Sequence, residues 1–196
     1  MGLYLFDGIE GYDYRSRLPL LPEERRLKAL RYSRERDTAL CVAAYMLLTA
    51  ALKEEYGVDS PVAFVYSDKG KPALRGLEGI YFNISHCPHG VACAVSNGQV
   101  GVDIEQIKPF NYSAALKVFC ENELDALEHT GERELEFARI WTRKEAQLKR
   151  DGTGFTGSPR LIDTTRLTDI RTYAYEKFVV SESGCGSTGV KRLDIC

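Results

Sequence analysis

The 196-residue sequence predicts an α+β fold, in which helices and antiparallel strands occur in separate blocks. Two observations support this class. A pair of helical segments followed by short strands occurs about twice along the chain, which points to two similar halves. The dipeptide Asn97-Gly98, between two apolar runs, is the strongest short signal for an antiparallel hairpin.

The first elements form a strand and two helices. Leu3–Phe6 is a short apolar strand, and a helix follows over residues 21–32. Pro22 lies in its first turn beside two acidic residues, where a helix start tolerates proline and favours negative charge. A long helix covers residues 35–56, and Gly57 ends it.

Short strands follow, separated by turns. The hairpin signal places Gln99–Glu105 antiparallel to Val91–Val95. The residues between the strands predict a basic loop over Ser67–Pro72 and a second loop over His86–Gly90. The predicted strands are Pro61–Tyr66, Ile80–Ser85 and Val91–Ser96.

The second half repeats this order in a looser form. Its predicted helices are a short one within Phe110–Val118, then Glu121–His129 and a longer one over residues 134–150. Weaker strands are predicted at Leu161–Ile162 and Thr172–Ser181, and Ser183–Gly189 is expected to be mobile. We place the boundary between an N-terminal half, residues 1–98, and a C-terminal half, residues 99–196.

Composition is that of an ordinary globular protein, with 44% hydrophobic and 28% charged residues. The net charge of −2 argues against nucleic-acid binding. Residues 15–36 hold eight basic side chains against three acidic ones, which fits a small anionic ligand or, equally well, a solvated helix face. The longest uncharged run, Thr38–Leu52, has 15 residues and is too short for a membrane span. We expect a monomer without membrane partners.

The cysteines indicate a reducing compartment. None of the six forms a Cys-x-x-Cys pair, and several lie in apolar runs, as buried free thiols do. The N-terminus meets a charge at Asp7 and lacks a signal-peptide core. We expect a cytoplasmic protein.

Val100–Glu105 is the first stretch that carries candidate functional residues. Side chains alternate along a strand, so the valines and Ile104 face one way while Gly101, Asp103 and Glu105 face the other. Gly101 should leave the space before the two carboxylates open. Paired carboxylates suit a hard divalent cation such as Mg²⁺, which binds one or two of them together with phosphate oxygens.

Trp141–Lys149 is the second such stretch. Trp141, Glu145 and Lys149 are spaced by four residues and lie along one helical stripe. The simplest interpretation of Glu145 and Lys149 is a solvated ion pair. The carboxylate-bearing strand that precedes this helix in the sequence argues against that interpretation.

Two further motifs have competing interpretations. Gly152–Gly157 matches the dinucleotide-binding glycine pattern but follows a helix instead of a strand, so we interpret it as a loop. A zinc site from His86, Cys87, His89 and Cys93 is disfavoured because zinc sites prefer two separated ligand pairs.

Taken together, these stretches resemble the Sfp-type 4′-phosphopantetheinyl transferases. The matching segments run from about residue 21 to residue 155 and keep the family's order and spacing. They are Gly70-Lys71-Pro72, Phe82–His86, Gly101–Glu105 and Trp141–Lys149, with Phe119–Glu123 as an intervening motif that has Cys120 in place of Ser.

The resemblance implies a pseudo-dimer of two α+β halves with the active site in the cleft between them. It implies Mg²⁺-dependent transfer of 4′-phosphopantetheine from coenzyme A to a serine of an apo acyl or peptidyl carrier protein, with release of 3′,5′-ADP. The residues that resemble metal ligands are Asp103, Glu105 and Glu145. Glu145 and Lys149 resemble the catalytic pair, and those that resemble coenzyme A contacts are Lys28, Arg31, Lys71, Ser85 and His86.

The chain departs from the family at two places. Family members hold the 3′-phosphate of coenzyme A with an Arg-Thr-like pair, but the matching positions here are Ala39 and Leu40. Lys28, Arg31 and Arg34 are the candidates to substitute. Residues 183–196 do not resemble a final strand, so we expect the second half to be trimmed.

Two other functions remain open at this stage. A non-catalytic module that binds coenzyme A or a carrier protein would use the same cleft, and an unrelated Mg²⁺-dependent phosphohydrolase would need no carrier surface. An apolar group beside the carboxylate strand is a candidate carrier surface, with a satellite core as the alternative: Phe110, Tyr112, Leu116 and Phe119.

Overall fold

The computed structural model describes residues 1–152 and 158–195 and confirms the α+β class. The N-terminal part contains β1 (Gly2–Phe6), α1 (Tyr14–Arg17), a 3₁₀ turn (Leu18–Leu20), α2 (Glu23–Ala29), α3 (Glu35–Tyr56), β2 (Phe64–Tyr66), β3 (Pro72–Leu74), β4 (Tyr81–Cys87) and β5 (Gly90–Ser96). The C-terminal part contains β6 (Gly101–Gln106), α4 (Tyr112–Val118), α5 (Glu121–His129), α6 (Arg133–Asp151), 3₁₀ turns at Pro159–Leu161 and Thr164–Arg166, β7 (Ile170–Ala174), β8 (Phe178–Ser183) and β9 (Val190–Arg192).

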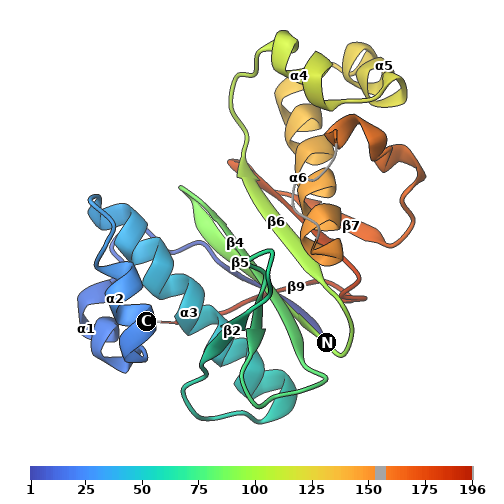
Figure 1. Cartoon of the computed structure of the whole chain (residues 1–196). Coiled ribbons are helices and arrows are strands. Elements are labelled where there is room, and N and C mark those ends of the chain that lie inside the picture. Colours follow the sequence, from blue (N-terminus) through green and yellow to red (C-terminus); the bar gives the residue numbers. More distant parts are fainter. Residues whose placement is uncertain (153–157, 196) are drawn as a thin grey trace.

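Two sheets pack back to back, and one long helix covers the outer face of each (Figure 1). The first sheet has the strand order β4-β5-β1-β9 and is covered by α3. The second has the order β6-β8-β7 and is covered by α6. Each half therefore combines a helix with a sheet. The pseudo-dimeric symmetry and the division at residue 98 stay predictions.

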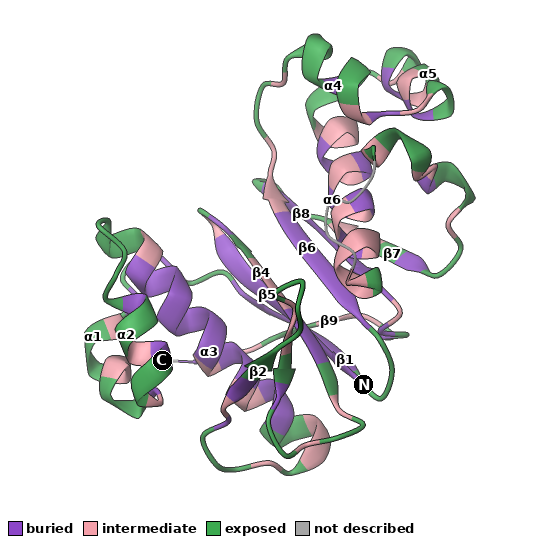
Figure 2. Ribbon diagram, in the orientation of Figure 1, coloured by how far each residue is buried: buried purple, intermediate pink, exposed green. Residues whose placement is uncertain are grey.

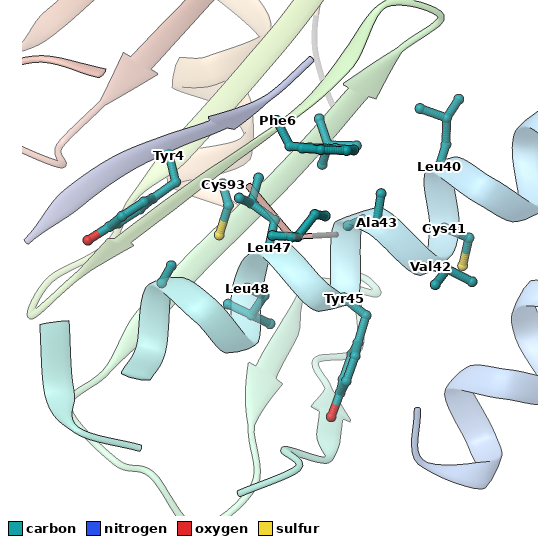
Figure 3. Close-up of a cluster of buried hydrophobic side chains, with 14 of the residues drawn as sticks. Tyr4, Phe6, Leu40, Cys41, Val42, Ala43, Tyr45, Leu47, Leu48 and Cys93 are labelled. Atoms are coloured by element: carbon teal, nitrogen blue, oxygen red, sulfur yellow. The ribbon is translucent and has the colours of Figure 1, made fainter. Parts of the chain in front are cut away.

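The core of the first half lies between α3 and the first sheet. Tyr4 and Phe6 of β1 belong to one buried cluster with Ala43 and Leu47 of α3, and Figure 3 shows part of this cluster. The alternate β1 residues, Leu3 and Leu5, join a second cluster on the opposite face. The strand is buried throughout because both faces of its sheet are covered, as Figure 2 shows for the inner strands.

The predicted hairpin at Asn97-Gly98 is wrong. The chain leaves β5 there, but β6 pairs antiparallel with β8 in the other sheet. Val100, Val102 and Ile104 pack against the apolar back of the first sheet, so β6 buries them by crossing that face instead of extending its ladder. The Val102 amide donates to Asn83 Oδ1 of β4 at 2.9 Å, which joins the two sheets through a side chain.

The end of the chain also differs from the prediction. The strand expected at Leu161–Ile162 is part of a 3₁₀ turn, and residues 172–181 form parts of two strands, β7 and β8. The segment expected to be mobile is packed, because buried Glu182 accepts hydrogen bonds from the Cys185 amide and the Ser187 hydroxyl. β9 is a true strand, which pairs parallel with β1 and returns the tail to the first half.

Other features bear on the expected compartment. Within the described residues, the five cysteines are free thiols, and Cys196 lies outside them. No described helix is both long and apolar enough to cross a membrane. Most of the glycine-rich loop, residues 153–157, also lies outside the described part of the chain.

Candidate active site

Strand β6 presents its two carboxylates to α6. Asp103 is buried at 6% exposure and Glu105 is half-buried, on the face opposite the core valines, as the alternation predicted. Helix α6 packs along β6 and β8 and carries Glu145 and Lys149 on the adjoining surface. The strand and the helix were separate stretches in the sequence, and packing makes them one site.

Gly101 has a different role from the one predicted. A Cβ atom at this position would overlap the carbonyl oxygen of Ala146 and lie 2.5 Å from the amide nitrogen of Arg150. The space before the carboxylates is therefore filled by the backbone of α6. Glycine at residue 101 is what allows the helix to lie so close to the strand.

Lys149, Asp103 and Ser85 form a three-way contact. Lys149 Nζ lies 2.6 Å from Asp103 Oδ1 and donates to Ser85 Oγ at 3.0 Å. Ser85 Oγ donates to the same Asp103 oxygen at 2.8 Å. In this structure Lys149 therefore pairs with Asp103 from another element, which argues against a simple Glu145–Lys149 surface pair.

Glu145 has a perturbed pKa. Burial raises the pKa of this carboxyl, the negative charges of Asp103 and Glu105 raise it further, and Lys149 acts in the opposite direction. Each added negative charge in a partly buried site disfavours ionisation of the next. A hard divalent cation bound by these carboxylates would relieve the repulsion that Asp103 and Glu105 exert on a charged Glu145.

Glu105 is half-buried and already has polar partners. Its Oε1 forms a 3.1 Å ion pair with Lys108 and accepts a hydrogen bond from the Gln106 amide. Lys108 is exposed, so this ion pair is weak and Glu105 remains free to exchange it for another cation.

A different acidic group, Cys120, Glu123 and Asp163, has ligand atoms within 4.8 Å of one another. Glu123 is fully buried, and Lys144 Nζ lies 2.6 Å from its Oε2. Thr164 donates to the other oxygen through its amide and hydroxyl, at 2.9 and 2.8 Å. These contacts satisfy the buried charge, so the group is a structural network between α5, α6 and the following turns.

Ser85 and His86, two predicted coenzyme A contacts, lie on opposite faces of strand β4 because side chains alternate along a strand. Asn83, Ser85 and Cys87 face the second sheet, whereas His86 faces the side on which α2 and α3 lie. His86 is part of the strand and not of the predicted loop. Cys87 and Cys93 lie in different core clusters on opposite faces of the sheet, so the zinc interpretation is wrong.

His86 lines a cavity of about 230 Å³ between α2, α3 and β2–β4. Although solvent reaches the ring, the surrounding walls lower the pKa of His86, and the positive charge of Lys149 lowers it further. Lys28 also lines this cavity, whereas Arg31 is exposed and does not. The remaining lining residues are Arg25, Tyr32, Cys41, Ala44, Phe64, Tyr66, Gly70, Pro72, Phe82, Asn83 and Ile84.

Lys71 joins the two halves. Its Nζ donates to Gln99 Oε1 at 2.9 Å and to the Arg150 carbonyl oxygen at 2.8 Å. Its sequence neighbours Gly70 and Pro72 line the His86 cavity, but Lys71 does not. Its predicted contact with a ligand stays a prediction.

Comparison with known proteins supports the resemblance to one family. Residues 99–185 match the family model described as the 4′-phosphopantetheinyl transferase superfamily. This stretch contains Asp103, Glu105, Glu145 and Lys149. Over this stretch the chain is similar to the 4′-phosphopantetheinyl transferase superfamily.

Individual relatives extend the match beyond that stretch. The chain is 28% identical to a 4′-phosphopantetheinyl transferase of Bacillus subtilis over 158 residues, which cover 79% of this chain and 70% of the relative. It is 32% identical to psf-1 of Bacillus pumilus, covering 70% of this chain and 60% of that protein. The 4′-phosphopantetheinyl transferase AcpT of Salmonella typhi is 40% identical over 57% of each chain. Each of these relatives is named as a transferase, and the protein is assigned to that enzyme class.

Proposed function

We propose that this protein transfers the 4′-phosphopantetheine group of coenzyme A to a serine of an apo acyl or peptidyl carrier protein and releases 3′,5′-ADP. The observation that carries the proposal is the meeting of β6 and α6. There Lys149 of α6 contacts Asp103 of β6 and Ser85 of β4. Asp103 and Glu105 lie close enough to raise the pKa of Glu145. His86, the sequence neighbour of Ser85, lines the basic cavity. A phosphate-bearing substrate needs such a combination of cations and metal-binding carboxylates.

The carboxylates of Asp103, Glu105 and Glu145 would hold Mg²⁺, which when bound neutralises charge on the phosphate oxygens. Lys149 adds a fixed positive charge to stabilise the negative charge that develops on the 5′-phosphate of 3′,5′-ADP as it leaves. The serine oxygen forms a bond to phosphorus as the bond to 3′,5′-ADP breaks. Glu145, with its raised pKa, accepts the serine proton as general base. Lys28 and His86 would bind the nucleotide end, with Arg31 and Lys71 as outer contacts.

The decisive experiment measures the mass of a purified apo carrier protein after incubation with this protein, coenzyme A and Mg²⁺. The expected product is a carrier heavier by one phosphopantetheine group, formed only when coenzyme A and the metal are both present. The alternative is a module that binds coenzyme A or a carrier without catalysis. Binding of either ligand with no gain in mass would favour that module.

The candidate carrier surface is only partly exposed. Phe119 is fully buried and belongs to a satellite core with Leu127 and Ile140, so its predicted place on a surface is wrong. Tyr112 and Leu116 of α4 are 41% and 46% exposed. An apolar cavity of about 390 Å³ lies beside them, lined by Phe110, Phe137 and Trp141 and reaching Glu105. Exposed apolar side chains beside a site of this kind form partner surfaces.

Tyr112→Ala is expected to raise KM for the carrier about tenfold while leaving KM for coenzyme A unchanged, because an exposed aromatic side chain acts as an interface anchor. Steady-state kinetics with each substrate varied in turn is the measurement. Tyr81→Ala, which removes a similarly exposed tyrosine from the first half, is the matched control. Equal increases in both constants, or a large fall in melting temperature, would instead assign Tyr112 to the core.

A further inference from the structure

Arg25 is a buried cation without a carboxylate partner. Arg25 is 8% exposed, and its Nε atom is buried and has no hydrogen-bond partner. The contacts of its guanidinium are weak, with Nη2 3.9 Å from Cys41 Sγ and the charged carbon 4.9 Å from the centre of the Phe64 ring. No ion pair joins Arg25 to an acidic residue within the part of the chain that the structure describes. Arginines are almost never buried in this way unless a partner compensates the charge.

The surroundings of Arg25 point to the missing partner. Arg25 lines the cavity that Lys28 and His86 also line, and no aspartate or glutamate is among its lining residues. A walled cavity with cations and no counter-charge concentrates anions. The guanidinium is a planar fork that binds phosphate through two parallel hydrogen bonds, which a lysine cannot do.

We propose that Arg25 binds the 3′-phosphate of coenzyme A from the wall of this cavity, in place of the absent Arg-Thr-like pair. This inference rests on the proposed function. Ala39 and Leu40, which occupy the positions of that pair, are buried apolar residues that do not line the cavity. Arg31 is exposed and lies outside the lining. Arg25 therefore takes over the charge from a different helix, α2.

The test compares binding of coenzyme A with binding of 3′-dephospho-coenzyme A by calorimetry. The parent protein should bind coenzyme A more tightly. Arg25→Gln should weaken the binding of coenzyme A at least about tenfold, which is the usual effect of losing a hydrogen bond to a charged group. Its affinity for 3′-dephospho-coenzyme A should stay unchanged. The affinity of Arg25→Lys for coenzyme A should lie between those of the parent protein and Arg25→Gln, because lysine keeps the positive charge but lacks the planar guanidinium. Arg75→Gln, which removes an exposed arginine outside the cavity lining, should change neither constant more than about twofold.

The melting temperature without ligand separates binding from structure. Arg25→Gln removes a buried, uncompensated charge, so the melting temperature should stay the same or rise. A lower melting temperature with equal weakening of both compounds would make Arg25 structural and overturn the inference. Retention of the parent's preference by Arg25→Gln would also overturn it, while leaving the proposed function intact. Failure of the parent protein to bind either compound would instead reject the proposed function.

Discussion

Glu145→Gln is expected to lower turnover of the carrier at least about 10²-fold, the usual loss for a general base. Glutamine preserves the size of the side chain but loses its charge and its capacity to accept a proton. Because the same carboxylate is a proposed metal ligand, the Mg²⁺ concentration for half-maximal rate should rise. Turnover measured across a Mg²⁺ titration reports both effects in one experiment.

Lys149→Met should lower turnover by a similar order, about 10²–10³-fold, because it removes a preorganised positive charge. Its effect on Mg²⁺ should differ from that of Glu145→Gln. Lys149 Nζ lies 2.6 Å from Asp103 Oδ1 and thus competes with a cation for that oxygen. Without this competition, half-maximal turnover should need the same Mg²⁺ concentration or less. The two variants therefore separate a metal ligand from a fixed charge.

Glu134→Gln and Lys53→Met are matched controls, since both change exposed side chains at other places on the two long helices. Each should keep the turnover and the Mg²⁺ dependence of the parent. If Glu145→Gln and Lys149→Met behave like these controls, the assignment of α6 to catalysis is wrong and both residues are structural.

The sequence predicted those parts of the fold that depend on local signals. Alternation placed Val102 and Asp103 on opposite faces of β6, and the positions of α3, α5 and α6 agreed closely with the predicted helices. Strand pairing was predicted incorrectly. The turn signal at Asn97-Gly98 reports local backbone preference, whereas burial of the β6 valines between the two sheets decided the partner strand. A local sequence pattern cannot show whether the apolar side of β6 extends the first sheet or packs across its face.

The same limit applies to the candidate site. The spacing in α6 predicted that Glu145 and Lys149 share a stripe, but not that Lys149 pairs with Asp103 or that Gly101 admits the helix backbone. Arg25 is one of eight basic residues in a basic segment, and nothing in its sequence context distinguishes it from the exposed Arg31. Burial makes this distinction, and burial depends on residues far away in the chain.

Lys144 is the clearest example, and Lys144→Met is expected to destabilise the protein by about 3–5 kcal/mol. The side chain is fully buried and lies 2.6 Å from Glu123 Oε2, and its Nζ also donates to the carbonyl oxygens of Pro159 and Ile162. Methionine keeps the volume of the stem but leaves a buried carboxylate without its cation. Urea unfolding measures the loss, and Lys53→Met, which breaks an exposed ion pair with Asp59, should cost less than about 1 kcal/mol.

The double variant Glu123→Leu/Lys144→Met isolates the cause. If the cost of Lys144→Met comes from the uncompensated charge, removing that charge as well should restore part of the lost stability, because apolar replacements of buried ion pairs are often tolerated. A double variant that is less stable by the sum of both single losses would contradict this account. Because Lys144 precedes Glu145 and fixes the turns after α6, a large loss would also show that the network between α5 and α6 supports the helix that presents Glu145.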